Sequence, residues 1–388
     1  MSKIPLSAPS FKGKEWQYVK ETLDTEWVSS AGKYVDLFEE EIAKYTGSKY
    51  AIACVNGTSA LQVSYRLAGV VAGDEVIVPT LTFIAPINAV LYNGATPVFM
   101  DADAYYNIDE EKTIRFIKEE TIFKDGFSFN KKTKARISAI TPVHVWGNAA
   151  WLDDLIPLCK ERNIAVVEDA SESLGTVYID GDNSGKHTGT LGRIGCLSFN
   201  GNKIITSAGG GMILTDDVNL AEKAKYLTTQ AKDDSVKFIH DEMGYNFRLT
   251  NIQAALGLAQ LEQLPDIIKQ KQKIHKKYIE KIEAIDGLSM ARAPDYAQNN
   301  HWLNVMQIES ENFGETPEQL MNRLDENNIQ TRPVWALNHL QKIYRNCQIY
   351  NINKGEELIR KSLCLPSSSN LLIEDINKIS NIIWKKSY

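Results

Sequence analysis

Between residues 49 and 216, short apolar runs alternate with stretches that have the apolar spacing of helices. The runs are rich in Val, Ile and Ala, and polar residues do not occupy every second position in them. Strands buried on both faces have this pattern, which is typical of a mostly parallel sheet. The sequence therefore predicts an α/β layered domain. In chain order the runs are KYAIACV, DEVIVP, TPVFMD, ARISAITPVHV, IAVVEDA, GCLSFN and GGMILTD.

Helical spacing dominates after Gly244. Apolar residues recur every three to five positions over residues 249–264, which predicts a helix that ends before Pro265. A second helix is expected at about residues 266–285, with its apolar residues on one face. From about residue 286 onward, strand-like pieces such as HWLNVMQI mix with helices, which indicates a smaller α+β unit.

The chain is therefore expected to have two domains. Residues 1–265 would form a large α/β domain, and residues 266–388 a small C-terminal α+β domain. Two segments, 120–136 and the glycine-rich 180–192, have the weakest pattern, and we expect both to be loops.

Composition and charge exclude several classes of protein. Of the 388 residues, 43% are apolar and 24% charged, as in ordinary globular proteins, and a net charge of −6 gives no general attraction to nucleic acid. The five cysteines are scattered without a Cys-x-x-Cys pair, which argues against a disulfide framework and a zinc site. No apolar run approaches the ~18 residues that a membrane span needs, so we expect a cytoplasmic protein with neither a membrane nor a nucleic-acid partner.

Three positions that follow predicted strands carry candidate chemistry, because ligands of parallel sheets bind at the carboxyl ends of the strands. Gly57, Thr58 and Ser59 lie at a predicted helix start, where free N–H groups favour a phosphate. Asp169 ends a buried strand and needs a cation or donors nearby. Lys203 lies just beyond another strand, where loss of water would make its amine nucleophilic. Taken singly, an ordinary helix cap, a capping acid and a surface lysine explain these residues at least as well.

Together, the three positions match the needs of pyridoxal 5′-phosphate (PLP). A lysine holds the aldehyde of this cofactor as a Schiff base, a carboxylate keeps its pyridine nitrogen protonated, and a helix start binds its phosphate. Motifs for other cofactors are missing: no G-x-G-x-x-G follows a strand, and neither G-x-x-x-x-G-K-[ST] nor H-E-x-x-H occurs.

At these residues the sequence resembles the DegT/DnrJ family of PLP-dependent nucleotide-sugar aminotransferases, which have the aspartate aminotransferase fold (fold type I). The resemblance extends over nearly the whole chain. Within the family, the sequence looks most similar to the enzymes that aminate C4 of UDP-4-keto-6-deoxy-N-acetylglucosamine on the way to N-acetylbacillosamine or legionaminic acid. The segments that carry it include NGTSAL, PTLTFIAPINAV, PVHVWGNAAWLD, VEDASESLGT, SFNGNKIITSAGGGM, GYNFRLTNIQAALGLAQLEQL, TRPVWALNHLQ and CLPSSSN.

The resemblance implies a role for each matching residue. Lys203 matches the catalytic Schiff-base lysine, and Asp169 matches the partner of the pyridinium nitrogen. Thr58, flanked by Gly57 and Ser59, matches a phosphate ligand, as does Ser198.

Three further cofactor contacts come from the resemblance alone. Phe83 matches an aromatic side chain against the cofactor ring, and Glu172 matches a polar residue near the 3-hydroxyl. Asn246 matches an asparagine that reaches the phosphate of the neighbouring subunit, which implies a homodimer with composite active sites. His144 is interpreted as structural, whereas His240 and Arg332 are left open as contacts of the sugar nucleotide.

The implied reaction is a ping-pong transamination. L-Glutamate would give its amino group to the cofactor and leave as 2-oxoglutarate, and the C4 keto group of the nucleotide sugar would then receive the amine. A 3-keto sugar aminotransferase and a PLP-dependent sugar dehydratase stay open as alternatives, although a histidine replaces the lysine in the dehydratases. A non-catalytic regulator with the same fold is the third alternative.

Overall fold

The computed structural model describes residues 3–234 and 236–384. A central sheet contains a path of eight strands, and the prediction of an α/β fold with a mostly parallel sheet is confirmed. The strand β10 runs antiparallel to both of its neighbours, and the other neighbouring pairs along the path from β9 to β15 are parallel. The order is β1 (Tyr50–Cys54), β10 (Gly211–Thr215), β9 (Ile194–Ser198), β7 (Ala165–Asp169), β6 (Arg136–Ile140), β2 (Glu75–Pro79), β3 (Thr96–Met100) and β15 (Ile349–Tyr350).

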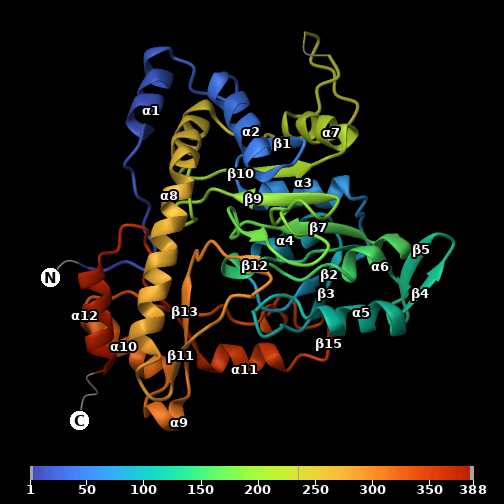
Figure 1. The fold of residues 1–388 in the computed structure, drawn as a ribbon. Coiled ribbons are helices and arrows are strands. Elements are labelled where there is room, and N and C mark those ends of the chain that lie inside the picture. The colour runs from blue at the N-terminus through green and yellow to red at the C-terminus, as the bar shows by residue number, and fades with distance from the viewer. Residues whose placement is uncertain (1–2, 235, 385–388) are drawn as a thin grey trace.

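Helices cover the sheet, so its strands are buried on both faces (Figure 1). In β1, Ala51 and Ala53 join the apolar cluster that contains Phe38, whereas Ile52 and Cys54 join the cluster on the opposite face. This explains why the apolar runs lack alternation with polar residues. The helices of this part are α1 (Glu15–Asp24), α2 (Lys33–Thr46), α3 (Gly57–Leu67), α4 (Ala85–Tyr92), α5 (Glu110–Glu119), α6 (Leu155–Glu161) and α7 (Val218–Thr228), with the 3-10 turn η1 (Val145–Gly147).

The two helices expected on either side of Pro265 are one helix, α8 (Asn251–Ile282), so that prediction was wrong. A proline inside a helix removes one donor and adds a clash, but apolar packing continues on both sides of it. Leu264 and Ile267 are buried in the same cluster as the sheet, and Tyr278 is buried in the core of the C-terminal part. Figure 1 shows α8 running beside both parts of the molecule. A domain boundary near residue 265 stays a proposal.

The segment 120–136 contains a hairpin that the sequence pattern did not predict. Strands β4 (Thr121–Lys124) and β5 (Phe127–Asn130) pair antiparallel, and β5 also pairs with β6. Asp125 and Gly126 form the two-residue turn with φ of 52° and 82°, as a type I′ turn requires. The hairpin was missed because Ile122, Phe123 and Phe127 are exposed, so no buried face sets a period of two. Residues 180–192 contain turns and one isolated bridge, as expected for a loop.

The C-terminal part is built on a four-stranded antiparallel sheet with its own apolar cluster. This agrees with the α+β pattern expected after residue 286. The strands are, in order, β11 (Leu288–Met290), β13 (Asn304–Ile308), β16 (Ser362–Leu365) and β14 (Arg332–Pro333). The helices are α9 (Ser310–Phe313), α10 (Pro317–Glu326), η2 (Asn338–Leu340), α11 (Lys354–Lys361) and α12 (Ile373–Trp384), and a short pair joins β12 (Ala297–Gln298) to β8 (Val177–Tyr178).

All five cysteines are present as free thiols. Within residues 3–234 and 236–384, no helix is long and apolar enough to cross a membrane.

Candidate active site

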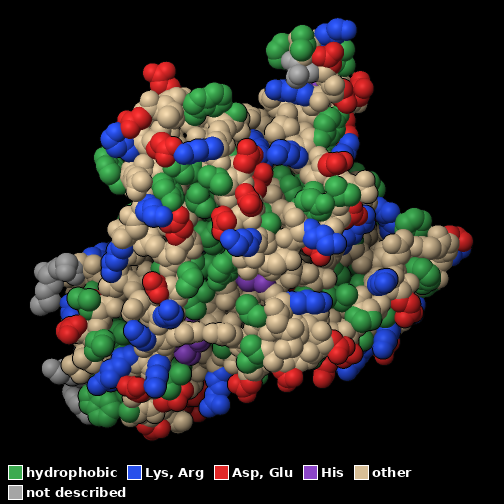
Figure 2. Space-filling model, turned by 45° about the horizontal axis from the view of Figure 1, so that its top comes forward, with side chains coloured by type: hydrophobic (Ala, Val, Ile, Leu, Met, Phe, Trp, Pro, Cys, Tyr) green, Lys and Arg blue, Asp and Glu red, His purple; other side chains and the backbone are tan. Residues whose placement is uncertain are grey.

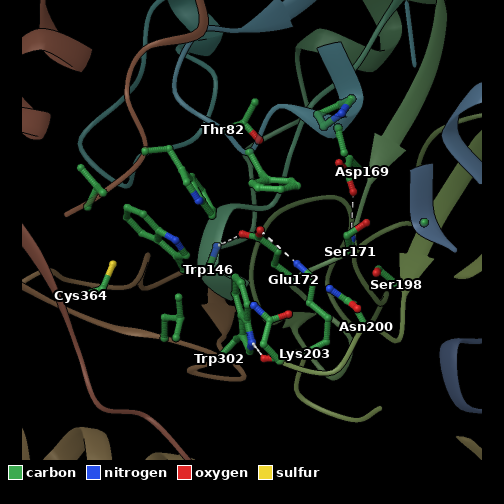
Figure 3. A pocket seen from close by; sticks show the side chains of 18 of the residues that line it. Thr82, Trp146, Asp169, Ser171, Glu172, Ser198, Asn200, Lys203, Trp302 and Cys364 are labelled. Atoms are coloured by element: carbon green, nitrogen blue, oxygen red, sulfur yellow. Dashed lines mark hydrogen bonds and ion pairs between the residues drawn. The ribbon is translucent and has the colours of Figure 1, made fainter. Parts of the chain in front are cut away.

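A cavity of about 580 Å³ lies where the carboxyl ends of β7 and β9 face the C-terminal part of the chain. Its sheet side includes Gly57, Thr58, Asp169, Ser198 and Lys203, so the structure brings all three predicted strand-end positions together. Its opposite side comes from the C-terminal part and includes Trp302, Arg332 and Trp335. Figure 3 shows the labelled side chains converging on this space.

The start of α3 forms one end of the cavity. The Asn56 side chain caps the helix by accepting the N–H of Ser59 at 2.8 Å. Ser59 itself is buried and is not among the residues that line the cavity. The N–H of Thr58 finds no acceptor within the described residues and lies at the positive end of the helix dipole. A Cβ on Gly57 would lie 2.9 Å from the Cβ of Ser198, so glycine is needed for the two segments to approach. This corner is suited to a phosphate.

Asp169 ends β7 with 4% of its surface exposed. Its Oδ1 accepts the N–H of Ser171 at 3.0 Å, and the residue lines the cavity. A buried carboxylate in this position is stabilised by a cationic or strongly donating partner, such as the protonated nitrogen of a pyridine ring.

The preceding residue, Glu168, lies on the other face of the strand and is fully buried. Burial raises the pKa of Glu168, but hydrogen bonds from His144 and from the backbone N–H groups of Gly192 and Gly189 outweigh it and lower the pKa below its ordinary value. Nδ1 of His144 accepts the N–H of Ala150, so Nε2 carries the proton and donates to Glu168 at 2.9 Å. His144 does not line the cavity, in agreement with its interpretation as structural.

Lys203 follows β9 in a bend, and 12% of its side chain is exposed. Its Nζ lies 3.3 Å from Oε1 of Glu172 and 4.1 Å from the centre of the Trp302 ring. The other oxygen of Glu172 accepts the N–H of Trp146 at 2.8 Å. Figure 3 shows Lys203 and Glu172 facing each other at the centre of the cavity. The amine is therefore inside the site and not on the surface.

The remaining predicted residues differ in their position. Phe83 lines the cavity, is half-exposed, and packs against Trp335 at a ring separation of 6.2 Å. Asn246 is exposed and does not line the cavity of its own chain. His240 also lies outside the cavity, and its Nδ1 is hydrogen-bonded to the carbonyl of Gln230.

Three tryptophans in the lining were not predicted as site residues. Trp146 and Trp335 pack with their ring centres 5.2 Å apart, and Trp302 lies under Lys203. In the sequence they are separated by 30 to 190 residues of unrelated pattern, so no spacing rule joins them. Arg332 also lines the cavity and has no acidic partner among the described residues.

The donor set of the cavity fits PLP. A buried carboxylate, an amine of low exposure, a helix start with a free N–H and a half-exposed aromatic ring surround one space. These groups match the ring nitrogen, the aldehyde, the phosphate and the ring face of the cofactor, in that order.

Comparison with known proteins gives the same class. Residues 9–384 match the DegT/DnrJ/EryC1/StrS aminotransferase family, and the chain therefore belongs to this family. The fold and the site thus define a PLP-dependent sugar aminotransferase, an enzyme whose cofactor is PLP.

Individual relatives cover almost the entire chain. A GDP-perosamine synthase of Caulobacter vibrioides is 35% identical over 382 residues, which are 98% of this chain and 97% of the relative. The solved structure of Helicobacter pylori PseC, an aminotransferase involved in the biosynthesis of pseudoaminic acid, has a TM-score of 0.87 and 25% identity, and the match covers 99% and 98% of the two chains. An Escherichia coli GDP-4-keto-6-deoxy-D-mannose-3-dehydratase shares the fold at a TM-score of 0.86 and 23% identity, over 99% and 100% of the chains.

Replacing Asp169 by Asn tests the carboxylate in the cavity. Asn keeps an oxygen for the N–H of Ser171 but removes the charge, and a charge-assisted hydrogen bond contributes about 1.5–3 kcal/mol. We expect Asp169→Asn to weaken PLP binding about 10- to 100-fold, measured by titrating the cofactor-free protein and following its visible absorption.

The matched control is Asp74→Asn, which makes the same chemical change at the amino end of β2. Asp74 is buried and paired with Arg136, away from the cavity. Its replacement is expected to leave PLP affinity within about twofold. Equal affinities of the wild-type protein and Asp169→Asn would contradict this reading of the site.

Proposed function

We propose that the enzyme transfers the amino group of L-glutamate to the C4 keto group of a nucleotide-linked 4-keto-6-deoxy sugar, with UDP-4-keto-6-deoxy-N-acetylglucosamine as the substrate. The observation that carries this proposal is the position of the Lys203 amine, which lies inside the cavity between Glu172 and Trp302. A lysine at this point can serve both halves of a ping-pong transamination.

Each residue has a defined task in this proposal. When bound, PLP supplies the electron sink that makes a carbon–hydrogen bond beside nitrogen acidic. Asp169 would hold the proton on the ring nitrogen, and Thr58 and Ser198 would bind the phosphate. Lys203 Nζ would take the α-proton of glutamate in the first half-reaction and would deliver a proton to C4 of the sugar in the second. Glu172, next to Nζ, keeps the amine directed at the reacting carbons.

Aminotransfer is preferred to dehydration because Lys203 is a lysine, whereas a histidine would take its place in a dehydratase. The dehydratase with a similar fold is related at 23% identity, which speaks for the shared fold and not for a shared reaction.

The walls of the cavity support a deoxy sugar with an acyl group. Trp146 and Trp335 present apolar surface, against which the C6 methyl and an acetamido methyl group can pack. The diphosphate needs a local cation, since a net charge of −6 does not attract an anion. Arg332 lines the cavity without an acidic partner in the described part of the chain, and we assign it to this role.

A homodimer with composite sites is part of the proposal. Asn246 lies at the base of an arm formed by residues 231–234 and 236–246, which projects from the molecule (Figures 1 and 2). The side chains of Val236, Phe238 and Met243 on this arm are exposed, which is costly unless another protein surface covers them. Arg66 on α3 anchors the arm through the carbonyl of Met243 and the carboxylate of Glu242. If a second copy of the chain covers the arm, Asn246 would reach the start of α3 in that second copy, where the phosphate is proposed to bind.

A panel of keto sugar nucleotides tests the proposed substrate. With ¹⁵N-labelled glutamate, the UDP-linked 4-keto-6-deoxy-N-acetylglucosamine should give a ¹⁵N-labelled product with its amine on C4, at a kcat/KM at least about tenfold above that of the GDP-linked 4-keto-6-deoxymannose. Mass spectrometry reports the label, and NMR reports the carbon that carries it. An amine on C3, or loss of water without uptake of ¹⁵N, would refute the proposal in favour of one of the two alternatives.

Complementation between chains tests the composite site. Asn246→Ala should weaken PLP binding about tenfold, since it removes a hydrogen bond to a charged group. Co-expression with Lys203→Ala under a second affinity tag allows the mixed dimer to be purified. This dimer contains one site with both Lys203 and Asn246, so one tight, borohydride-reducible PLP per dimer is expected.

Two results would count against the shared site. One is wild-type PLP affinity in Asn246→Ala, and the other is a mixed dimer that binds PLP no more tightly than the Asn246→Ala homodimer.

A further inference from the structure

The contact between Lys203 and Trp302 has no part in the reaction as described so far. Nζ lies 4.1 Å from the centre of the indole ring, and Trp302 is 3% exposed. A cation over the face of a tryptophan is attracted by the ring quadrupole, and this attraction is strongest when water is excluded. The indole face therefore gives Nζ a favourable contact whenever the amine carries a positive charge.

Glu172 is the second neighbour of the amine, and its carboxylate is shared with another donor. Burial raises the pKa of the Glu172 carboxyl above its ordinary value, although the charge of Lys203 and the N–H of Trp146 oppose the rise. Its Oε2 is already occupied by Trp146, and its Oε1 lies at the long distance of 3.3 Å from Nζ. Trp302, with its ring centre 4.1 Å from Nζ, is a second contact for the ammonium.

The indole is held in place by bonds at both ends of the residue. Its Nε1–H donates to the carbonyl of Asn202 at 2.7 Å, and Asn202 is the residue next to Lys203. The backbone N–H of Trp302 donates to Oδ1 of Asn300 at 2.9 Å, and its carbonyl accepts Nζ of the buried Lys271 at 2.8 Å. Trp302 therefore keeps a fixed position relative to the loop that carries Lys203.

We propose that Trp302 is a positioning residue whose indole face holds the Lys203 ammonium while Lys203 is detached from the cofactor. The inference rests on the proposed role of Lys203. Between the two carbons that exchange the proton, Nζ carries that proton and a positive charge, and Trp302 keeps this charge inside the cavity. The indole gains and loses no proton. The proton that Nζ takes from the first carbon is the one it delivers to the second.

The first test observes the position of Lys203 without turnover. In the enzyme loaded with pyridoxamine phosphate, Lys203 is free, and ¹³Cε-lysine labelling should show one lysine resonance shifted upfield by the indole ring current. Lys203→Ala identifies this resonance by its absence. In Trp302→Leu the shift should vanish, and in Trp302→Phe it should be smaller. Trp151→Leu, which removes an indole outside the cavity lining, is the matched control and should leave the shift unchanged.

The second test measures single-turnover rates of both half-reactions. Trp302→Leu should lower each rate about tenfold with little change in the KM of either substrate, because the contact acts on the proton carrier. Trp302→Phe keeps a weaker aromatic face and should fall between the wild-type enzyme and Trp302→Leu. The Phe variant also keeps the inference testable if the Leu variant does not fold.

An unshifted Lys203 resonance in the wild-type enzyme would overturn the inference. So would equal rates in Trp302→Phe and Trp302→Leu, which would mean that volume and not the aromatic face matters. Failure of the proposed function has a different signature: Lys203→Ala would then still form a borohydride-reducible bond with PLP.

Discussion

The site depends on keeping an amine and two carboxylates charged or hydrogen-bonded in a space that is largely shielded from water. A buried charge without partners is costly, so each group must have its own. Asp169 accepts the N–H of Ser171 and lines the cavity, and Glu172 is shared between the N–H of Trp146 and the amine of Lys203. The free ammonium of Lys203 also needs a stabilising contact, and the ring of Trp302, from the C-terminal part of the chain, provides it.

Hydrogen bonds next to the cavity join the sheet domain to the C-terminal part of the chain. Next to the cavity, the side chain of Asn338 donates to the carbonyls of Thr80 and Thr82, and the ring of His339 is hydrogen-bonded to the Thr80 hydroxyl. These bonds fix the turn that carries Trp335 against the one that carries Phe83. The helix α8, continuous from residue 251 to 282, contacts both parts.

The sequence predicted the sheet because strands buried on both faces consist of continuous apolar runs, which can be recognised in the sequence. It predicted Asp169 and Lys203 because both follow such strands, and parallel strands place their carboxyl ends together. Other features leave no such trace. The contact between Trp146 and Trp335 joins segments more than 150 residues apart. The helix α8 continues through Pro265 because its tertiary packing outweighs the helix-breaking effect of this proline. The N–H of Ser59 is bonded to the cap residue Asn56, a local detail that the motif alone did not predict.

The central claim is that Lys203 bears the cofactor, and chemical trapping tests it most directly. Borohydride reduction of the purified enzyme followed by peptide mapping should place the pyridoxyl group on Lys203. The informative alternative is Lys271, a fully buried lysine whose pKa burial lowers to about 7, but whose Nζ is bonded to the carbonyls of Trp302 and Ser367. A pyridoxyl group on Lys271, or on any lysine other than Lys203, would contradict the account.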